Sequence, residues 1–108
     1  MVNYDKLRYV EKLRTLQSRS YYLLNTNRTM IIDAHKEYDE SIILNVTNNG
    51  GTIDFTFTDL MTNEVTSFNN PNTNTYEIPL KKGNKIKLHI TSSKAVGSYK
   101  IVRKTIKD

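Results

Sequence analysis

Every second residue is apolar in two stretches of the last third of the chain, residues 76–80 and 86–90. The apolar positions are Tyr76, Ile78, Leu80, Ile86, Leu88 and Ile90. A period of two residues is typical of β-strands that bury one face. Between the two stretches, Gly83 and Asn84 tolerate the positive φ of a tight turn. The pattern therefore predicts two strands joined by a turn, and residues 97–101 predict a third.

The same alternation predicts short strands in the middle of the chain, over residues 21–24, 29–34, 41–47, 52–58 and 64–68. The sequence Asn-Asn-Gly-Gly at residues 48–51 indicates a hairpin turn between two of them. With the three strands of the last third, this gives about eight short strands at regular spacing. Such spacing is typical of an antiparallel β-sandwich.

Residues 3–18 carry a different pattern, which predicts an amphipathic helix. Asn3 can cap it, and neither glycine nor proline interrupts it. Its apolar arc consists of Leu7, Tyr9, Val10, Leu13 and Leu16. We expect this arc to pack on one face or the open end of the sandwich; the alternative is a helix that binds a partner or forms a homo-oligomer. The expected organisation is one domain over residues 1–108, with a helix at 1–18 and a β-sandwich at 20–108.

The last third also carries a family resemblance. The residues are Leu80-x-x-Gly83-Asn84-x-Ile86-x-Leu88-x-Ile90, followed by Gly97-x-Tyr99-x-Ile101. This cadence resembles the closing strands of small bacterial jelly-roll sandwich modules, which include GOLD-like and pre-peptidase C-terminal-like domains. The resemblance, which covers only the last third, implies a jelly-roll-like sandwich. With the pattern of the rest of the chain, the expected fold is mainly β: an N-terminal amphipathic helix followed by an antiparallel jelly-roll-like β-sandwich of about eight strands. The resemblance also implies a module that binds carbohydrate or a cell surface.

Charge is distributed unevenly along the chain, whose net charge is +5. Residues 33–77 carry one basic and eight acidic side chains, whereas residues 78–108 carry nine basic and one acidic. Lys85 and Lys87 alternate with core positions and must share a face, which Lys100 and Lys104 of a neighbouring strand can join. These four lysines are the predicted binding residues, for nucleic acid or another polyanion, unless they only keep the sheet soluble and guard its edges.

The sequence offers little for catalysis or metal binding. The chain contains no cysteine, and its two histidines fall on an expected loop and an expected solvent face. The run Asp33-x-His35-x-Glu37-x-Asp39-Glu40 offers carboxylate oxygens that suit calcium, but it lacks the glycine of a calcium-binding turn. We interpret the run as a solvated loop, and we predict no catalytic residue, no metal site and no cofactor.

Three functions remain. The first is a non-catalytic module for protein–protein interaction or assembly, with an unknown protein partner. The second is a module that binds carbohydrate or a cell surface, for which Tyr21, Tyr22 and Tyr38 are the aromatic candidates. The third is a binder of nucleic acid or another polyanion through the lysine face. No apolar run reaches the roughly 20 residues of a membrane span, and no targeting signal indicates a location.

Overall fold

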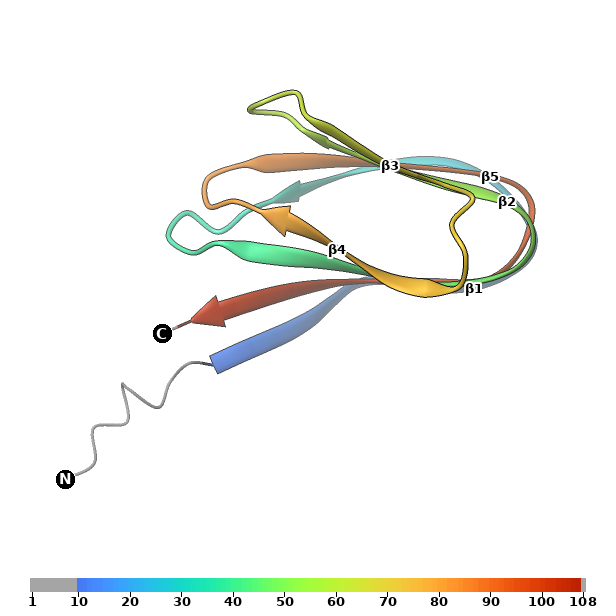
Figure 1. The fold of residues 1–108 in the computed structure, drawn as a ribbon, viewed down its shortest axis with the longest axis horizontal. Coiled ribbons are helices and arrows are strands. Elements are labelled where there is room, and N and C mark those ends of the chain that lie inside the picture. Colours follow the sequence, from blue (N-terminus) through green and yellow to red (C-terminus); the bar gives the residue numbers. More distant parts are fainter. Residues whose placement is uncertain (1–9, 108) are drawn as a thin grey trace.

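The computed structural model describes residues 10–107, with side chains for residues 13–105, as β-strands joined by loops (Figure 1). The strands are β1 (Val10–Asp33), β2 (Glu40–Asp59), β3 (Val65–Asn69), β4 (Asn74–Leu80) and β5 (Lys85–Lys107). No helix occurs between residues 10 and 107, and so this part of the chain contains no helix that could cross a membrane.

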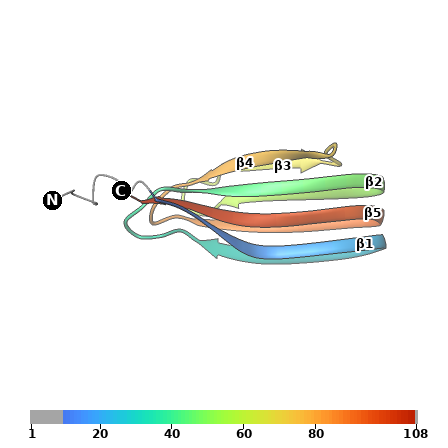
Figure 2. The ribbon, with the colours of Figure 1, turned by 90° about the horizontal axis from the view of Figure 1, so that it is seen from below.

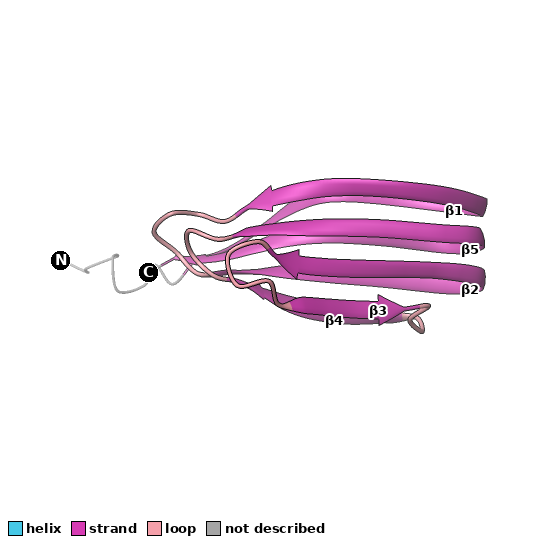
Figure 3. Ribbon diagram, turned by 90° about the horizontal axis from the view of Figure 1, so that it is seen from above, coloured by secondary structure: helices cyan, strands magenta, loops and turns pink. Residues whose placement is uncertain are grey.

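All five strands belong to one antiparallel sheet with β5 at its centre (Figures 2 and 3). β5 pairs with β1 along one side and with β2 along the other, and both pairings run over nearly the whole length of the strands. The first half of β2 also pairs with β4, and its second half pairs with β3. β1 is therefore one edge of the sheet, and β4 and β3 share the other.

The three long strands bend near their middles, and the sheet folds over on itself (Figure 1). The register of β5 shifts against β1 between Tyr21 and Thr26, and against β2 between Asn48 and Thr52. The first layer contains residues 10–21, 40–48 and 97–107 together with β4. The second layer contains residues 24–33, 52–59 and 85–93 together with β3. The bends form the closed end of the molecule.

Two glycines allow β2 and β5 to bend while they stay paired. A Cβ on Gly51 (φ +68°) would lie 2.1 Å from the carbonyl oxygen of Lys94, and a Cβ on Gly97 (φ +146°) would lie 1.9 Å from that of Thr47. Any side chain at these positions would collide with the neighbouring backbone, and the positive φ is itself unfavourable for other residues. Glycine thus permits the close approach through which the strands pass from one layer to the other.

The core lies between the two layers and is filled by alternate residues of the strands. Its fully buried large side chains are Phe55, Phe57, Ile42, Leu44, Ile53, Leu80, Leu88, Ile90 and Ile101. Aromatic contacts join the layers: Phe55 meets Tyr99 edge to face with ring centroids 5.5 Å apart, and Phe68 of β3 meets Tyr76 of β4 at 4.8 Å. Burial of this apolar surface is what holds the folded-over sheet closed.

The prediction of a helix at residues 3–18 is wrong for the part that the structure describes. Residues 10–18 begin β1 and pair with residues 100–107 of β5, whereas residues 1–9 lie outside the described part of the chain. The expected apolar arc does not pack as a unit, because Leu13 is 60% exposed while Leu16 packs on the core. Backbone pairing with β5 outweighs the local helical pattern. The homo-oligomer expected through this helix loses its basis as well.

The expected count of about eight strands, in a jelly-roll-like sandwich behind a helix, is also corrected. Residues 10–107 form five strands in one sheet, and the prediction of a mainly β fold is confirmed. Residues 48–51 do not reverse the chain as a hairpin does, since β2 runs through them. The strands predicted on either side of this segment are the two halves of β2. The strands predicted at residues 21–24 and 29–34 likewise belong to the single strand β1, and those predicted at residues 86–90 and 97–101 belong to β5.

We predict that Phe55→Ala and Phe57→Ala each lower the free energy of unfolding by about 3–5 kcal/mol, because each leaves a cavity between the layers. Both side chains are at most 2% exposed. Equilibrium urea unfolding is the measurement. Thr56→Ala, on the outer side of the same strand, is the control and should cost less than about 1 kcal/mol. A loss below about 1 kcal/mol for both phenylalanines would contradict the observed register.

A second prediction concerns the bends. Gly97→Ala should lower the free energy of unfolding by about 2 kcal/mol more than Gly83→Ala does. Both glycines have positive φ, but a Cβ on Gly83 has no neighbour within 4 Å, whereas one on Gly97 collides with Thr47. The difference between the variants in urea unfolding therefore isolates the contact between strands. Equal losses would show that β2 and β5 do not approach this closely at the bend.

Candidate functional site

The end of the molecule opposite the bends, here called the open end, brings together four segments that are distant in sequence (Figure 1). They are the start of β1, the loop at residues 34–39, the turn at residues 81–84 and the end of β5. The loop and the turn are held together by backbone hydrogen bonds. The Ala34 N–H donates to the carbonyl of Asn84 at 2.9 Å, and the Gly83 N–H donates to the carbonyl of His35 at 2.9 Å.

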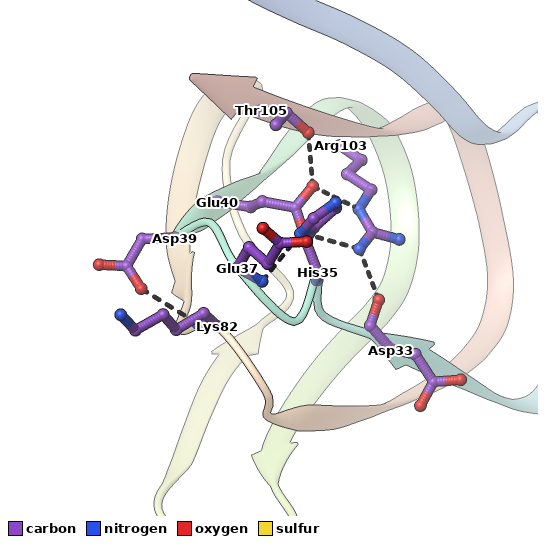
Figure 4. Close-up of polar contacts among 8 residues, drawn as sticks. All are labelled: Asp33, His35, Glu37, Asp39, Glu40, Lys82, Arg103 and Thr105. Atoms are coloured by element: carbon purple, nitrogen blue, oxygen red, sulfur yellow. Dashed lines mark hydrogen bonds and ion pairs between the residues drawn. The ribbon is translucent and has the colours of Figure 1, made fainter. Parts of the chain in front are cut away.

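A buried carboxylate, that of Glu40, lies at the open end (Figure 4). Arg103 of β5 donates to it twice, from Nε to Oε2 at 2.7 Å and from Nη2 to Oε1 at 2.6 Å. Oε1 also accepts the backbone N–H of His35 at 2.8 Å, and Oε2 accepts the hydroxyl of Thr105. Arg103 further donates to the carbonyl of Asp33. This cluster, which we call the Glu40–Arg103 latch, joins β1, β2 and β5 to the loop at residues 34–39.

The electrostatics of the latch favour the ionised carboxylate. Burial raises the pKa of Glu40, but hydrogen bonds from Arg103, Thr105 and the His35 backbone, together with the charge of Arg103, outweigh burial and lower this pKa to about 2. The hydrogen bond to Glu40 in turn raises the pKa of Arg103 above its ordinary value, despite partial burial. A buried charge is tolerated when it is paired and hydrogen-bonded in this way.

A pocket of about 340 Å³ lies beside the latch and is lined by Arg14, His35, Glu40, Arg103 and Thr105. Arg14 of β1 stands directly opposite Arg103 in the strand register. Within residues 13–105, Arg14 forms no hydrogen bond or ion pair. The ring of His35 accepts the Glu37 N–H at Nδ1 at 2.9 Å. The pocket therefore combines one paired and one unpaired guanidinium group.

The acidic run considered for calcium does not assemble into a metal site. Asp33 is an exposed ion-pair partner of Lys85 at 3.8 Å, and Asp39 accepts the backbone N–H of Lys82 at 3.0 Å. Glu40 is committed to the latch. Among the described residues, no group of three or more His, Asp or Glu side chains is placed to hold a metal ion. The interpretation of the run as a solvated loop also misses Glu40, which is only 7% exposed.

The four predicted binding lysines all belong to β5, but they occupy its two halves. Lys85 and Lys87 alternate with the buried Ile86 and Leu88, so they point outward from the second layer. Lys100 and Lys104 alternate with buried residues of the first layer and point outward there. Along β5, Lys85 and Lys87 therefore come before the bend, and Lys100 and Lys104 come after it. The two pairs lie on opposite outer faces, and whether they bind anything stays a prediction.

Basic residues nevertheless gather on one side of the molecule, because β1 and β5 are neighbours in both layers. β1 and β5 contain eleven Lys and Arg residues and two acidic ones, whereas β2, β3 and β4 contain four acidic residues and no basic ones. We call the β1–β5 side the basic side. The lysine pairs lie on its two outer faces, and β1 forms its edge.

Two arginines on the edge strand were not among the predicted binding residues. Arg19 lies opposite Tyr99 and Arg28 lies opposite Ile90, so both project from the core-facing side of β1, at the edge of the sheet. Both are exposed, and neither forms a hydrogen bond or ion pair within residues 13–105. Burial raises the pKa of Tyr99, while the charges of Arg19 and Arg28 act to lower it, which places both guanidinium groups near this phenol. Only the strand register of β1 could have revealed them.

The three tyrosines considered for sugar binding do not form a common platform. Tyr21 is half-buried and stacks near Tyr99 at 6.0 Å, Tyr22 is 78% exposed at the bend of β1, and Tyr38 packs on His35 at the open end. A depression of about 420 Å³ does lie on the outer face of the first layer. Its lining is mostly Ser, Thr and Asn, and its one tyrosine, Tyr99, is buried. This depression therefore offers no exposed aromatic ring on which a sugar ring could stack.

Comparison with known proteins adds little. No protein-family model and no curated protein matches the chain. Among solved structures, the P-domain of Macrobrachium rosenbergii nodavirus is similar at 13% sequence identity and a TM-score of 0.38, over 89% of this chain and 92% of that one. A likeness at this level carries no information on function, and the resemblance of the last third to GOLD-like modules stays a prediction.

The latch predicts a specific loss of stability in acid. Because the pKa of Glu40 is about 2 in the folded protein and about 4.5 in the unfolded chain, the unfolded state binds the proton first. The ionised Glu40 carboxylate contributes about 3 kcal/mol to the free energy of unfolding. This contribution is fully present above about pH 5 and is lost as the pH falls toward 2. Urea unfolding of the protein and of Glu40→Gln between pH 2 and 6 is the measurement. We expect the two curves to converge in acid; parallel curves would refute the lowered pKa.

Proposed function

We propose that the protein is a non-catalytic β-sandwich module that binds an acidic protein partner through its basic side. The observation that carries the proposal is the separation of charge between the two sides of one sheet. Surfaces of one sign attract partners of the opposite sign, and they accelerate and orient encounter. Arg19 and Arg28 give this side two guanidinium groups that have no ion-pair partner among residues 13–105.

The edge strand supports a protein partner in particular. β1 is 24 residues long and, among the strands of residues 10–107, has no neighbour on its outer side. An extended segment of a partner can add to such an edge through backbone hydrogen bonds. The register shifts in β1 at Thr15–Gln17 and Tyr21–Thr26 divide the edge into short regular stretches, which limits uncontrolled pairing. An acidic segment would satisfy both the free backbone groups and the arginines.

Nucleic acid is the weaker candidate for the same side. Single-stranded nucleic acids bind best where exposed aromatic side chains alternate with basic ones. On β1 and β5 the described side chains offer Tyr22 as a strongly exposed aromatic, while Tyr21 is half-buried and Tyr99 is buried. The absence of a stacking surface favours an acidic protein over an oligonucleotide.

The geometry also supports a non-catalytic role. General acid–base chemistry needs a carboxylate or histidine that is free to exchange a proton with a substrate. The carboxylate of Glu40 is fully occupied by the latch, and the two histidines lie in different regions, His35 at the open end and His89 on the outer face of the second layer. His89 Nε2 lies 2.5 Å from Asn27 Oδ1 and is engaged there.

The test is binding of a fluorescein-labelled poly-glutamate 20-mer, followed by fluorescence anisotropy at low and moderate salt. We expect salt-sensitive binding, because exposed charges are screened within about 10 Å at 0.1 M salt. The double variant Arg19→Glu/Arg28→Glu should weaken binding at least tenfold. Lys81→Glu/Lys82→Glu, in the turn at the end of β4, makes the same change in net charge and is the matched control.

Three results decide the proposal. A loss confined to the arginine variant supports the basic side, and equal losses in both variants would show that net charge alone is sensed, which contradicts it. Stronger binding of a single-stranded oligonucleotide than of poly-glutamate would place nucleic acid first. The variants Lys85→Glu/Lys87→Glu and Lys100→Glu/Lys104→Glu then show which outer face takes part. Circular dichroism checks that each variant stays folded.

A further inference from the structure

We propose that the pocket at the open end binds a small oxyanion, with Arg14 and Arg103 as its guanidinium ligands. This site is separate from the lateral arginines, Arg19 and Arg28, and it does not depend on the proposed function. The strand register places Arg14 directly opposite Arg103 on neighbouring strands. Directly opposed side chains lie about 5 Å apart at Cβ, and like charges so placed are destabilising.

The charges that line the pocket do not balance. Two guanidinium groups face a single carboxylate, that of Glu40, and Arg103 takes both of its oxygens. Arg14 has no carboxylate partner within residues 13–105, where the ion pairs join Asp33 to Lys85 and Glu40 to Arg103. A second anion in the pocket would relieve the repulsion between the arginines. Among residues 13–105, the site thus has one positive charge more than it has negative charges.

Donors that can hold this anion are already in place. Nε and Nη2 of Arg103 are used by Glu40 and Asp33, which leaves Nη1 without a hydrogen-bond partner among residues 13–105 on a residue that lines the pocket. The Arg103 side chain is 15% exposed and is fixed by the latch, so little freedom is lost when it binds. His35 accepts the Glu37 N–H at Nδ1, which leaves Nε2 as the ring nitrogen that can donate. Arg14 adds a second planar fork of N–H groups.

The ligand class follows from these donors and from the size of the pocket. Guanidinium groups match the geometry of carboxylate and phosphate oxygens. A volume of about 340 Å³ admits a small molecule or the head of a larger one. Because Glu40 supplies negative charge on one wall, a compact oxyanion fits better than an extended polyanion. Inorganic phosphate and acetate are the simplest probes of the two oxyanion types.

The test is a titration of the 15N-labelled protein with phosphate and, separately, acetate, with sodium chloride keeping the ionic strength constant. We expect saturable shifts of the Arg14 and Arg103 Nε–H signals and of the amides around His35. Arg14→Gln should weaken binding of the preferred anion at least fivefold. Arg28→Gln removes an exposed arginine from the same strand outside the pocket, and it should leave binding unchanged.

Each outcome bears on the proposal. Saturation by phosphate alone assigns a phosphate site, and saturation by acetate alone assigns a carboxylate site. Non-saturating shifts with both anions, or equal weakening by Arg14→Gln and Arg28→Gln, would overturn the proposal. Because Arg14 is exposed, its replacement should leave the fold intact, and the unchanged amide signals of the core in the same spectra verify this. Poly-glutamate binding by Arg14→Gln separates this site from the basic side.

Discussion

The backbone pairing of β5 with β1 on one side and β2 on the other is the interaction on which the rest of the structure depends. It continues past the bends, so the same three strands are neighbours in both layers. The short strands β3 and β4 then need only to complete the free side of β2 in each layer. The core forms where the layers close on each other, and the contact of Phe55 with Tyr99 is one product of that closure.

The same pairing explains where the polar groups lie. Because β1 and β5 are adjacent along their whole lengths, their basic residues gather on one side, while the acidic residues of β2 and β4 remain on the other. At the open end the pairing sets Arg14 beside Arg103, and the latch to Glu40 connects β5 to the first residue of β2. The candidate sites are thus consequences of strand order and not of any local motif.

Much of the fold follows from the period of the sequence, because burial of Ile86, Leu88 and Phe55 requires only that alternate residues face one core. The sequence predicts a hairpin turn at residues 48–51 where the structure has a bend within β2. The positive φ of Gly51 is compatible with either one, so the local sequence does not distinguish them. The prediction of a helix is wrong for residues 10–18 because they form a strand only by pairing with β5, whose residues are far away in the sequence. For the same reason the opposition of Arg14 and Arg103 has no signal in the sequence: a register between residues so far apart is set by the whole sheet.

The central claim is that residues 10–18 form the start of the edge strand β1 and pair with the end of β5, in place of the helix that their own sequence favours. Cross-strand nuclear Overhauser effects measure this pairing directly in the labelled protein. The structure predicts close backbone contacts of Arg14 with Arg103 and of Ser18 with Lys100, together with the chemical shifts of extended backbone over residues 13–20. Sequential amide–amide contacts typical of a helix, without the contacts to β5, would contradict the fold, the basic side and the pocket together.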